Sequence, residues 1–97
     1  MKFNIHGKKL EVTSAIKDYI ENKIGRLDKY FDNPENITAT VVIKIVGKNQ
    51  VVEVTINTNS FVIRGEEANS DLYASIDLVS DKIERQIRKN KTRMHKK

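Results

Sequence analysis

Residues 37–56 read ITATVVIKIVGKNQVVEVTI and contain the clearest strand pattern of the chain. Apolar side chains recur at every second position over residues 37–45, which is typical of a strand with one buried face. Gly-Lys-Asn at 47–49 supplies a turn, and the alternation resumes over residues 52–56. The stretch therefore predicts an antiparallel hairpin with one apolar and one polar face.

Two shorter strands are predicted on either side of this hairpin. Phe3 and Ile5 alternate with polar neighbours near the start of the chain, and Phe61 and Ile63 follow a polar turn at residues 57–60. The last strand continues the meander of the hairpin, so the polar face of the whole sheet is expected to look at water.

Two segments have the helical spacing of three and four residues instead. The first begins at Thr13 or Ser14 as the N-cap and is expected to end at Asp32–Pro34, because proline disfavours the helical conformation before it. Its apolar stripe is Ile16, Tyr19, Ile20, Ile24, Leu27, Tyr30 and Phe31. The second begins at Ser70, and its stripe is Leu72, Ile76, Val79, Ile83 and Ile87, with a continuation to Met94.

The predicted order is β-α-β-β-β-α. One apolar sheet face and two helices with matching stripes make an α+β two-layer sandwich, in which a four-stranded sheet carries both helices on one face. The 97 residues suffice for one modest core, so residues 1–97 are expected to form a single domain.

Basic residues are concentrated at the end of the chain. The net charge is +5, but residues 1–81 hold ten Lys or Arg against twelve Asp or Glu, whereas residues 82–97 hold eight against one. This asymmetry indicates a polyanionic partner for the last part of the chain. A merely solvated tail is the alternative.

Each helix is also sorted by charge around its axis. The first carries Lys23, Arg26 and Lys29 beside Tyr19 and Tyr30, with Asp18, Glu21 and Asp28 opposite; only Lys17 breaks the pattern. The second carries Lys82, Arg85, Lys89 and Arg93 on one flank, with Asp77, Asp81 and Glu84 facing away. Sorting gives up stabilising pairs between neighbours, so it favours a phosphate-binding surface. The tyrosines are interpreted as residues at the edge of the core.

Catalytic and cofactor sites find little support. The four glycines form no phosphate-binding loop, cysteine is absent, and His6 and His95 have no clustered ligands, so neither a metal nor a cofactor is expected. Glu66 and Glu67 are expected in a loop before the second helix, not as a catalytic pair. No segment has the length of a membrane span, and a cytoplasmic protein without a small-molecule substrate is expected.

The run from Asp71 to Arg93, DLYASIDLVSDKIERQIRKNKTR, resembles the signature of the bacterial ribosome hibernation-promoting factors, also called ribosome-associated inhibitors. The first helix is similar too, in Tyr19, Lys23, Leu27, Asp28 and Tyr30, so the resemblance covers essentially the whole chain. It implies a protein that lies in the mRNA channel and decoding region of the small ribosomal subunit, excludes mRNA and tRNA, and keeps ribosomes inactive. The ribosomal RNA contacts that it implies are Lys23, Arg26, Lys29, Lys82, Arg85, Arg88, Lys89, Lys91 and Arg93.

Two other functions are compatible with parts of this pattern. A free double-stranded RNA-binding domain has a similar element order but places lysines at the start of its last helix, where this chain has Ser70, Asp71 and Asp77. A protein-interaction module that uses the open sheet face would need a less polar surface than Thr38, Thr40, Lys44, Glu53, Thr55 and Asn57 provide.

Overall fold

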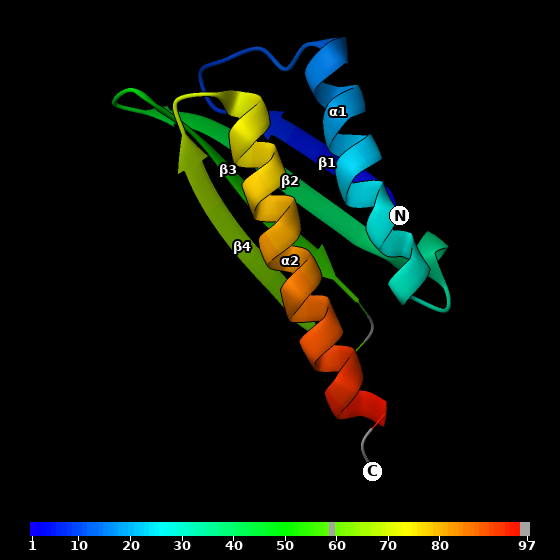
Figure 1. The fold of residues 1–97 in the computed structure, drawn as a ribbon. Helices are drawn as coiled ribbons and strands as arrows, with labels where there is room; N and C mark the ends of the chain where they lie inside the picture. The colour runs from blue at the N-terminus through cyan, green and yellow to red at the C-terminus, as the bar shows by residue number, and fades with distance from the viewer. Residues whose placement is uncertain (59, 96–97) are drawn as a thin grey trace.

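The computed structural model describes the backbone of residues 1–58 and 60–95 and the side chains of residues 1–58 and 60–90. Its elements follow the predicted order, with two short 3₁₀ helices added after the first α-helix (Figure 1). They are β1 (Lys2–Gly7), α1 (Ser14–Gly25), η1 (Arg26–Tyr30), η2 (Pro34–Asn36), β2 (Thr38–Val46), β3 (Asn49–Asn57), β4 (Val62–Asn69) and α2 (Leu72–His95).

The four strands form one mixed sheet in the order β1-β2-β3-β4. β1 runs parallel to β2, and β2, β3 and β4 form the predicted antiparallel meander. Both helices lie on the same face of the sheet, α2 against β3 and β4 and α1 beside it (Figure 1). The predicted α+β sandwich of two layers is therefore confirmed.

The core fills the space between these layers. Most predicted positions on β2, β3 and α2 are buried, namely Ala39, Val41, Ile43, Val52, Val54, Ile56, Ile76, Val79, Ile83 and Ile87. Leu72 at the start of α2 is only partly buried, and the side chain of Met94 lies outside the described residues. Two strand positions differ from the prediction: Phe61 precedes β4, and Ile45 is 54% exposed. Ile45 continues the alternation of apolar residues in β2, but it lies near the tip of the β2–β3 hairpin. This tip projects beyond α2 (Figure 1), so α2 does not cover it.

The first helix ends earlier than predicted. Thr13 is the N-cap, its hydroxyl accepting a hydrogen bond of 3.3 Å from the N–H of Ile16, but the α-helix stops at Gly25 and not at Asp32–Pro34. Glycine is a poor helix former, and the chain continues as the tighter η1. With three residues per turn, η1 keeps Leu27 and Tyr30 on the side that faces the core and α2.

Two further predictions at the β4–α2 connection are wrong. Glu66 and Glu67 lie inside β4, because the strand continues through Gly65, where an added Cβ would come 2.9 Å from Cδ1 of Ile83. The glycine lets α2 pack closely on the sheet. The second α-helix begins at Leu72 and not at Ser70, and Asp71 caps it: the Asp71 carboxylate accepts a 3.0 Å hydrogen bond from the N–H of Tyr73.

Candidate nucleic-acid interface

The first group of cations lies on α2, and one of its members contacts β4. We call Lys82, Arg85 and Lys89 the outer cationic flank. Lys82 Nζ lies 3.3 Å from Glu67 Oε2 and donates a 3.4 Å hydrogen bond to the carbonyl of Glu66. Arg85 and Lys89 are exposed, and within the described residues neither makes an ion pair or a side-chain hydrogen bond. Their charges are therefore directed to solvent.

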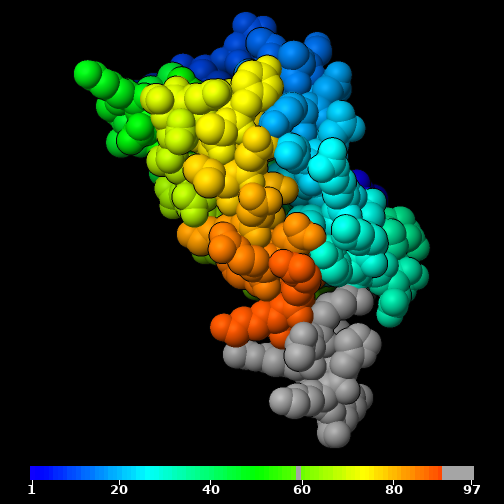
Figure 2. All heavy atoms as spheres, viewed as in Figure 1, coloured from blue at the N-terminus to red at the C-terminus, as the bar shows by residue number. Residues whose placement is uncertain are grey.

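The second group lies on α1 and η1. We call Lys23, Arg26 and Lys29 the inner cationic flank. Together with Leu27 of η1 and with Ser80, Asp81 and Glu84 of α2, they line one hollow of about 150 Å³. Figure 2 shows the two helices side by side across this face of the molecule. The structure thus places the inner cationic flank against α2.

Three carboxylates of α2 lie between the two flanks. We call Asp77, Asp81 and Glu84 the acidic stripe. Asp77 and Glu84 face α1 and η1: Asp77 Oδ1 lies 3.2 Å from Lys23 Nζ, and Glu84 accepts a hydrogen bond from Tyr30. Asp81 lies four residues before Arg85 and is therefore next to that cation on the surface of the helix. Asp81 and Glu84 share the hollow with the inner cationic flank. The sequence could not predict this placement, because helical spacing does not tell which neighbour a flank meets.

Two tyrosines fasten the acidic stripe to α1 and η1. Tyr19 donates a 2.7 Å hydrogen bond to Asp77, and Tyr30 donates one of 2.6 Å to Glu84. The bond to Asp77 raises the pKa of Tyr19, and the same bond lowers the pKa of Asp77. The bond to Glu84 raises the pKa of Tyr30. These bonds are favoured when the phenols are protonated and the carboxylates charged.

The rings of Tyr19 and Tyr30 make contacts within the protein. Both pack against the core, which confirms their interpretation as core-edge residues. Lys23 Nζ lies 5.9 Å from the ring centre of Tyr19, and Lys29 Nζ lies 5.3 Å from that of Tyr30. Tyr19 also meets Tyr73 edge to face, with ring centres 4.8 Å apart. The rings thus help to hold the cations in place.

Three predicted cations remain. Arg88 is exposed on α2 one turn after Glu84, near enough to Tyr30 for its charge to lower the pKa of that phenol. Lys91 and Arg93 belong to the backbone of α2, but their side chains lie outside the described residues. Arg88 therefore lies beside the inner cationic flank and not on the outer one.

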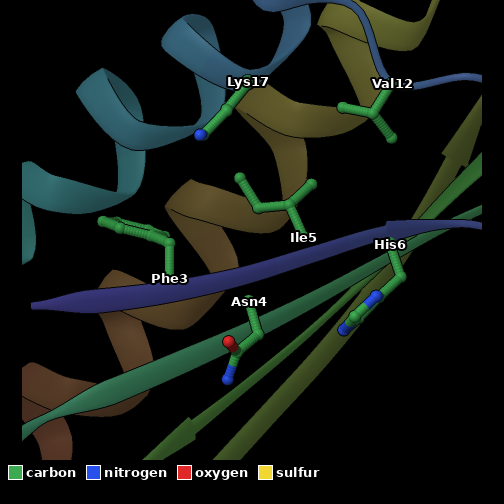
Figure 3. A pocket seen from close by; sticks show the side chains of 6 residues that line it. All are labelled: Phe3, Asn4, Ile5, His6, Val12 and Lys17. Atoms are coloured by element: carbon green, nitrogen blue, oxygen red, sulfur yellow. The ribbon is translucent and has the colours of Figure 1, made fainter.

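A further hollow lies at the edge of the sheet. A hollow of about 350 Å³ beside the β1 edge is lined by Phe3, Asn4, Ile5, His6, Val12 and Lys17 (Figure 3). His6, one of the polar residues that alternate with Phe3 and Ile5 in β1, is exposed there. Over the described part of the chain, no three His, Cys, Asp or Glu side chains gather as metal ligands would, and neither helix is long and apolar enough to cross a bilayer.

Known proteins resemble the chain over its whole length. The model of the family described as "Sigma 54 modulation protein / S30EA ribosomal protein" matches residues 3–95. Two curated relatives are each called "Ribosome hibernation promotion factor": that of Lactococcus lactis subsp. cremoris is 50% identical and that of Staphylococcus aureus 47%. Both alignments cover all of this chain, but only 53% and 52% of those proteins. The chain thus spans about half the length of these relatives.

Solved structures share the fold. The amino-terminal domain of Protein Y from Thermus thermophilus is 38% identical and superposes with a TM-score of 0.84, over 92% of this chain and 98% of that domain. A ribosomal subunit interface protein from Coxiella burnetii, at 20% identity, superposes with the same TM-score of 0.84 over 95% of this chain and 99% of that one. The latter likeness concerns the fold alone.

Proposed function

Since the chain belongs to the Sigma 54 modulation protein / S30EA ribosomal protein family, we propose that it binds the small ribosomal subunit in the cytoplasm and keeps ribosomes inactive. The relatives named ribosome hibernation promotion factor support this function. One observation supports the proposed binding surface above all: the outer cationic flank is exposed, and its Arg85 and Lys89 have no internal partner among the described residues.

The proposed mechanism is occupancy and not catalysis. The helical layer lies on ribosomal RNA at the mRNA channel and decoding region, where the folded domain excludes mRNA and tRNA. Each cation that neutralises a phosphate releases condensed counterions, which supplies affinity without chemistry. The tightly packed two-layer core makes the domain a rigid obstacle, so inhibition follows from its position alone.

The cations do not contribute equally in this proposal. Lys23 and Lys82 already face carboxylates at 3.2 Å and 3.3 Å, so a phosphate must compete with Asp77 or Glu67 for them. Arg85 and Lys89 carry no such internal pair within the described residues, and Arg adds bidentate contact with phosphate. We therefore rank Arg85 and Lys89 above Lys23 and Lys82.

Co-sedimentation with purified small subunits tests the proposal, with a long RNA duplex as competitor. The double variant Arg85→Gln, Lys89→Gln is compared with Lys8→Gln, Lys48→Gln, which removes the same charge from exposed positions outside the helical layer. We expect the first pair to reduce affinity at least tenfold and to abolish inhibition of translation, and the control to change affinity less than threefold.

Equal losses in the two variants would mean that the partner senses only net charge, and the proposed surface would then be wrong. Complete displacement by the duplex would favour a free duplex-binding domain. That reading is already disfavoured by the acidic start of α2, where Asp71 caps the helix and would repel phosphate.

A further inference from the structure

Charge changes sign twice across the helical layer. The inner cationic flank on α1 and η1 comes first, the acidic stripe of α2 follows, and the outer cationic flank lies beyond it. The first two rows line one hollow, and Lys82 of the third is held at β4 by Glu67 and the carbonyl of Glu66. A phosphate backbone that follows either flank is attracted, whereas one that runs along the middle meets carboxylates.

The acidic stripe has an end. Its members are spaced by four and three residues, and the next position on the same side of α2, one turn after Glu84, is Arg88. Arg88 lies close enough to Tyr30 of η1 to affect the pKa of its phenol. Beyond Glu84, the exposed charges of the described part of α2 are Arg85, Arg88 and Lys89. The two flanks therefore join there, and the cationic surface is forked.

A forked cationic surface fits the phosphate backbones of some RNA shapes better than those of others. Two backbones that converge, as at a helical junction, can each follow one flank and meet at Arg88. A continuous duplex is straight and densely charged, so when it covers both flanks it also places phosphates over the acidic stripe. Since like charges at close range are repelled, the stripe penalises that placement.

We propose that this surface selects branched RNA, in which two backbones converge, over a continuous duplex, and that Asp81 is a residue that sets this selection. The inference rests on the proposed function and specifies the shape of the RNA. Asp77 and Glu84 each hold a tyrosine, so they also serve the packing of the helices. Asp81 is exposed and has no hydrogen bond or ion pair within the described residues, so its carboxylate is accessible to a bound RNA.

Binding of a three-way RNA junction and of a plain duplex with the same number of nucleotides tests the proposal. We compare the parent, Asp81→Asn and Asp81→Lys. The control Glu66→Gln removes one exposed carboxylate from the open sheet face, since its neighbours Gly65 and Glu67 face α2. Circular dichroism and melting of all variants check that the fold is unchanged.

We expect the parent to prefer the junction. Asp81→Asn should raise duplex affinity about threefold and Asp81→Lys about tenfold, with smaller changes for the junction, so the preference falls in that order. Glu66→Gln should leave the ratio of the two affinities unchanged. A parent without preference for the junction, or equal gains of both RNAs in the Asp81 variants, would overturn the proposal.

Co-sedimentation of the same variants with small subunits separates this inference from the function on which it rests. A parent that binds subunits but does not distinguish junction from duplex contradicts the fork alone. A parent that distinguishes the two RNAs but does not sediment with subunits contradicts the proposed function and leaves the shape preference established.

Discussion

The phenol of Tyr30 donates a 2.6 Å hydrogen bond to Oε2 of Glu84, which ties η1 to α2 across 54 residues of sequence. Tyr19 makes the equivalent bond from α1 to Asp77. The two bonds fix the spacing of the helices, and with it the distance between the inner cationic flank and the acidic stripe. They are therefore part of the framework of the proposed binding surface as well as of the fold.

Tyr30→Phe should lower the melting temperature by a few degrees, because a hydrogen bond to a charged carboxylate is lost while the ring packing is kept. The measurement is thermal unfolding followed by circular dichroism. Glu84→Gln and the double variant complete a cycle: the double variant should be little worse than either single one. Additive losses would show that the bond contributes nothing to stability.

Gly65→Ala should destabilise the protein by about 1 kcal/mol, because the added Cβ would lie 2.9 Å from Cδ1 of the buried Ile83. Ile83→Val removes that methyl group and alone costs about 1 kcal/mol. In the Ile83→Val background, Gly65→Ala should lower the free energy of unfolding little or not at all. Urea unfolding of the four proteins measures the coupling; an unchanged cost of the alanine would mean that the strand, and not this contact, requires glycine.

Sequence patterns predicted the layers of this fold because burial sets the spacing of apolar residues. The alternation in β2 and β3 and the stripe of α2 place Val41, Val54 and Ile83 in the core, where the structure has them. The end of α1 was harder to predict: apolar spacing continues through η1, and only Gly25, with three-residue steps from Ile24 to Leu27 and Tyr30, signals the change to 3₁₀ geometry.

The surface was less predictable than the core. Charge sorting identified both flanks, but the contact of Lys23 with Asp77 joins residues 54 positions apart and depends on how α1 lies against α2. Likewise, Glu66 and Glu67 look like loop residues because acidic residues are rare in strands, yet β4 continues through them beside β3. Tertiary contacts decided both cases.

The stability of the parent relative to Asp77→Asn should depend on acid pH. The hydrogen bond from Tyr19 lowers the pKa of Asp77 below its ordinary value of 3.8. The stabilisation is therefore present in full above that value and is lost as the pH falls through the lower pKa of the folded state. Urea unfolding at several pH values should give a constant difference between pH 5 and pH 7 that shrinks below pH 4. If the difference in free energy of unfolding between the parent and Asp77→Asn stays unchanged down to pH 3, this prediction is wrong.

Binding to small subunits should weaken steeply with salt. If about five cations of the two flanks contact phosphates, the logarithm of the affinity falls against the logarithm of the salt concentration with a slope of about −3.5 to −4.5. Removing Arg85 and Lys89 should reduce the steepness by about 1.5 to 2, since each lost phosphate contact removes about 0.7 to 0.9 from the slope.

Lys8→Gln, Lys48→Gln serves as the control and should keep the parent slope, because these side chains lie outside the helical layer. Fluorescence anisotropy of a labelled protein at four salt concentrations measures all three slopes. A parent slope near zero would show that the flanks are only solvated, and a control slope as shallow as that of Arg85→Gln, Lys89→Gln would show that the RNA responds to the net charge of the whole domain.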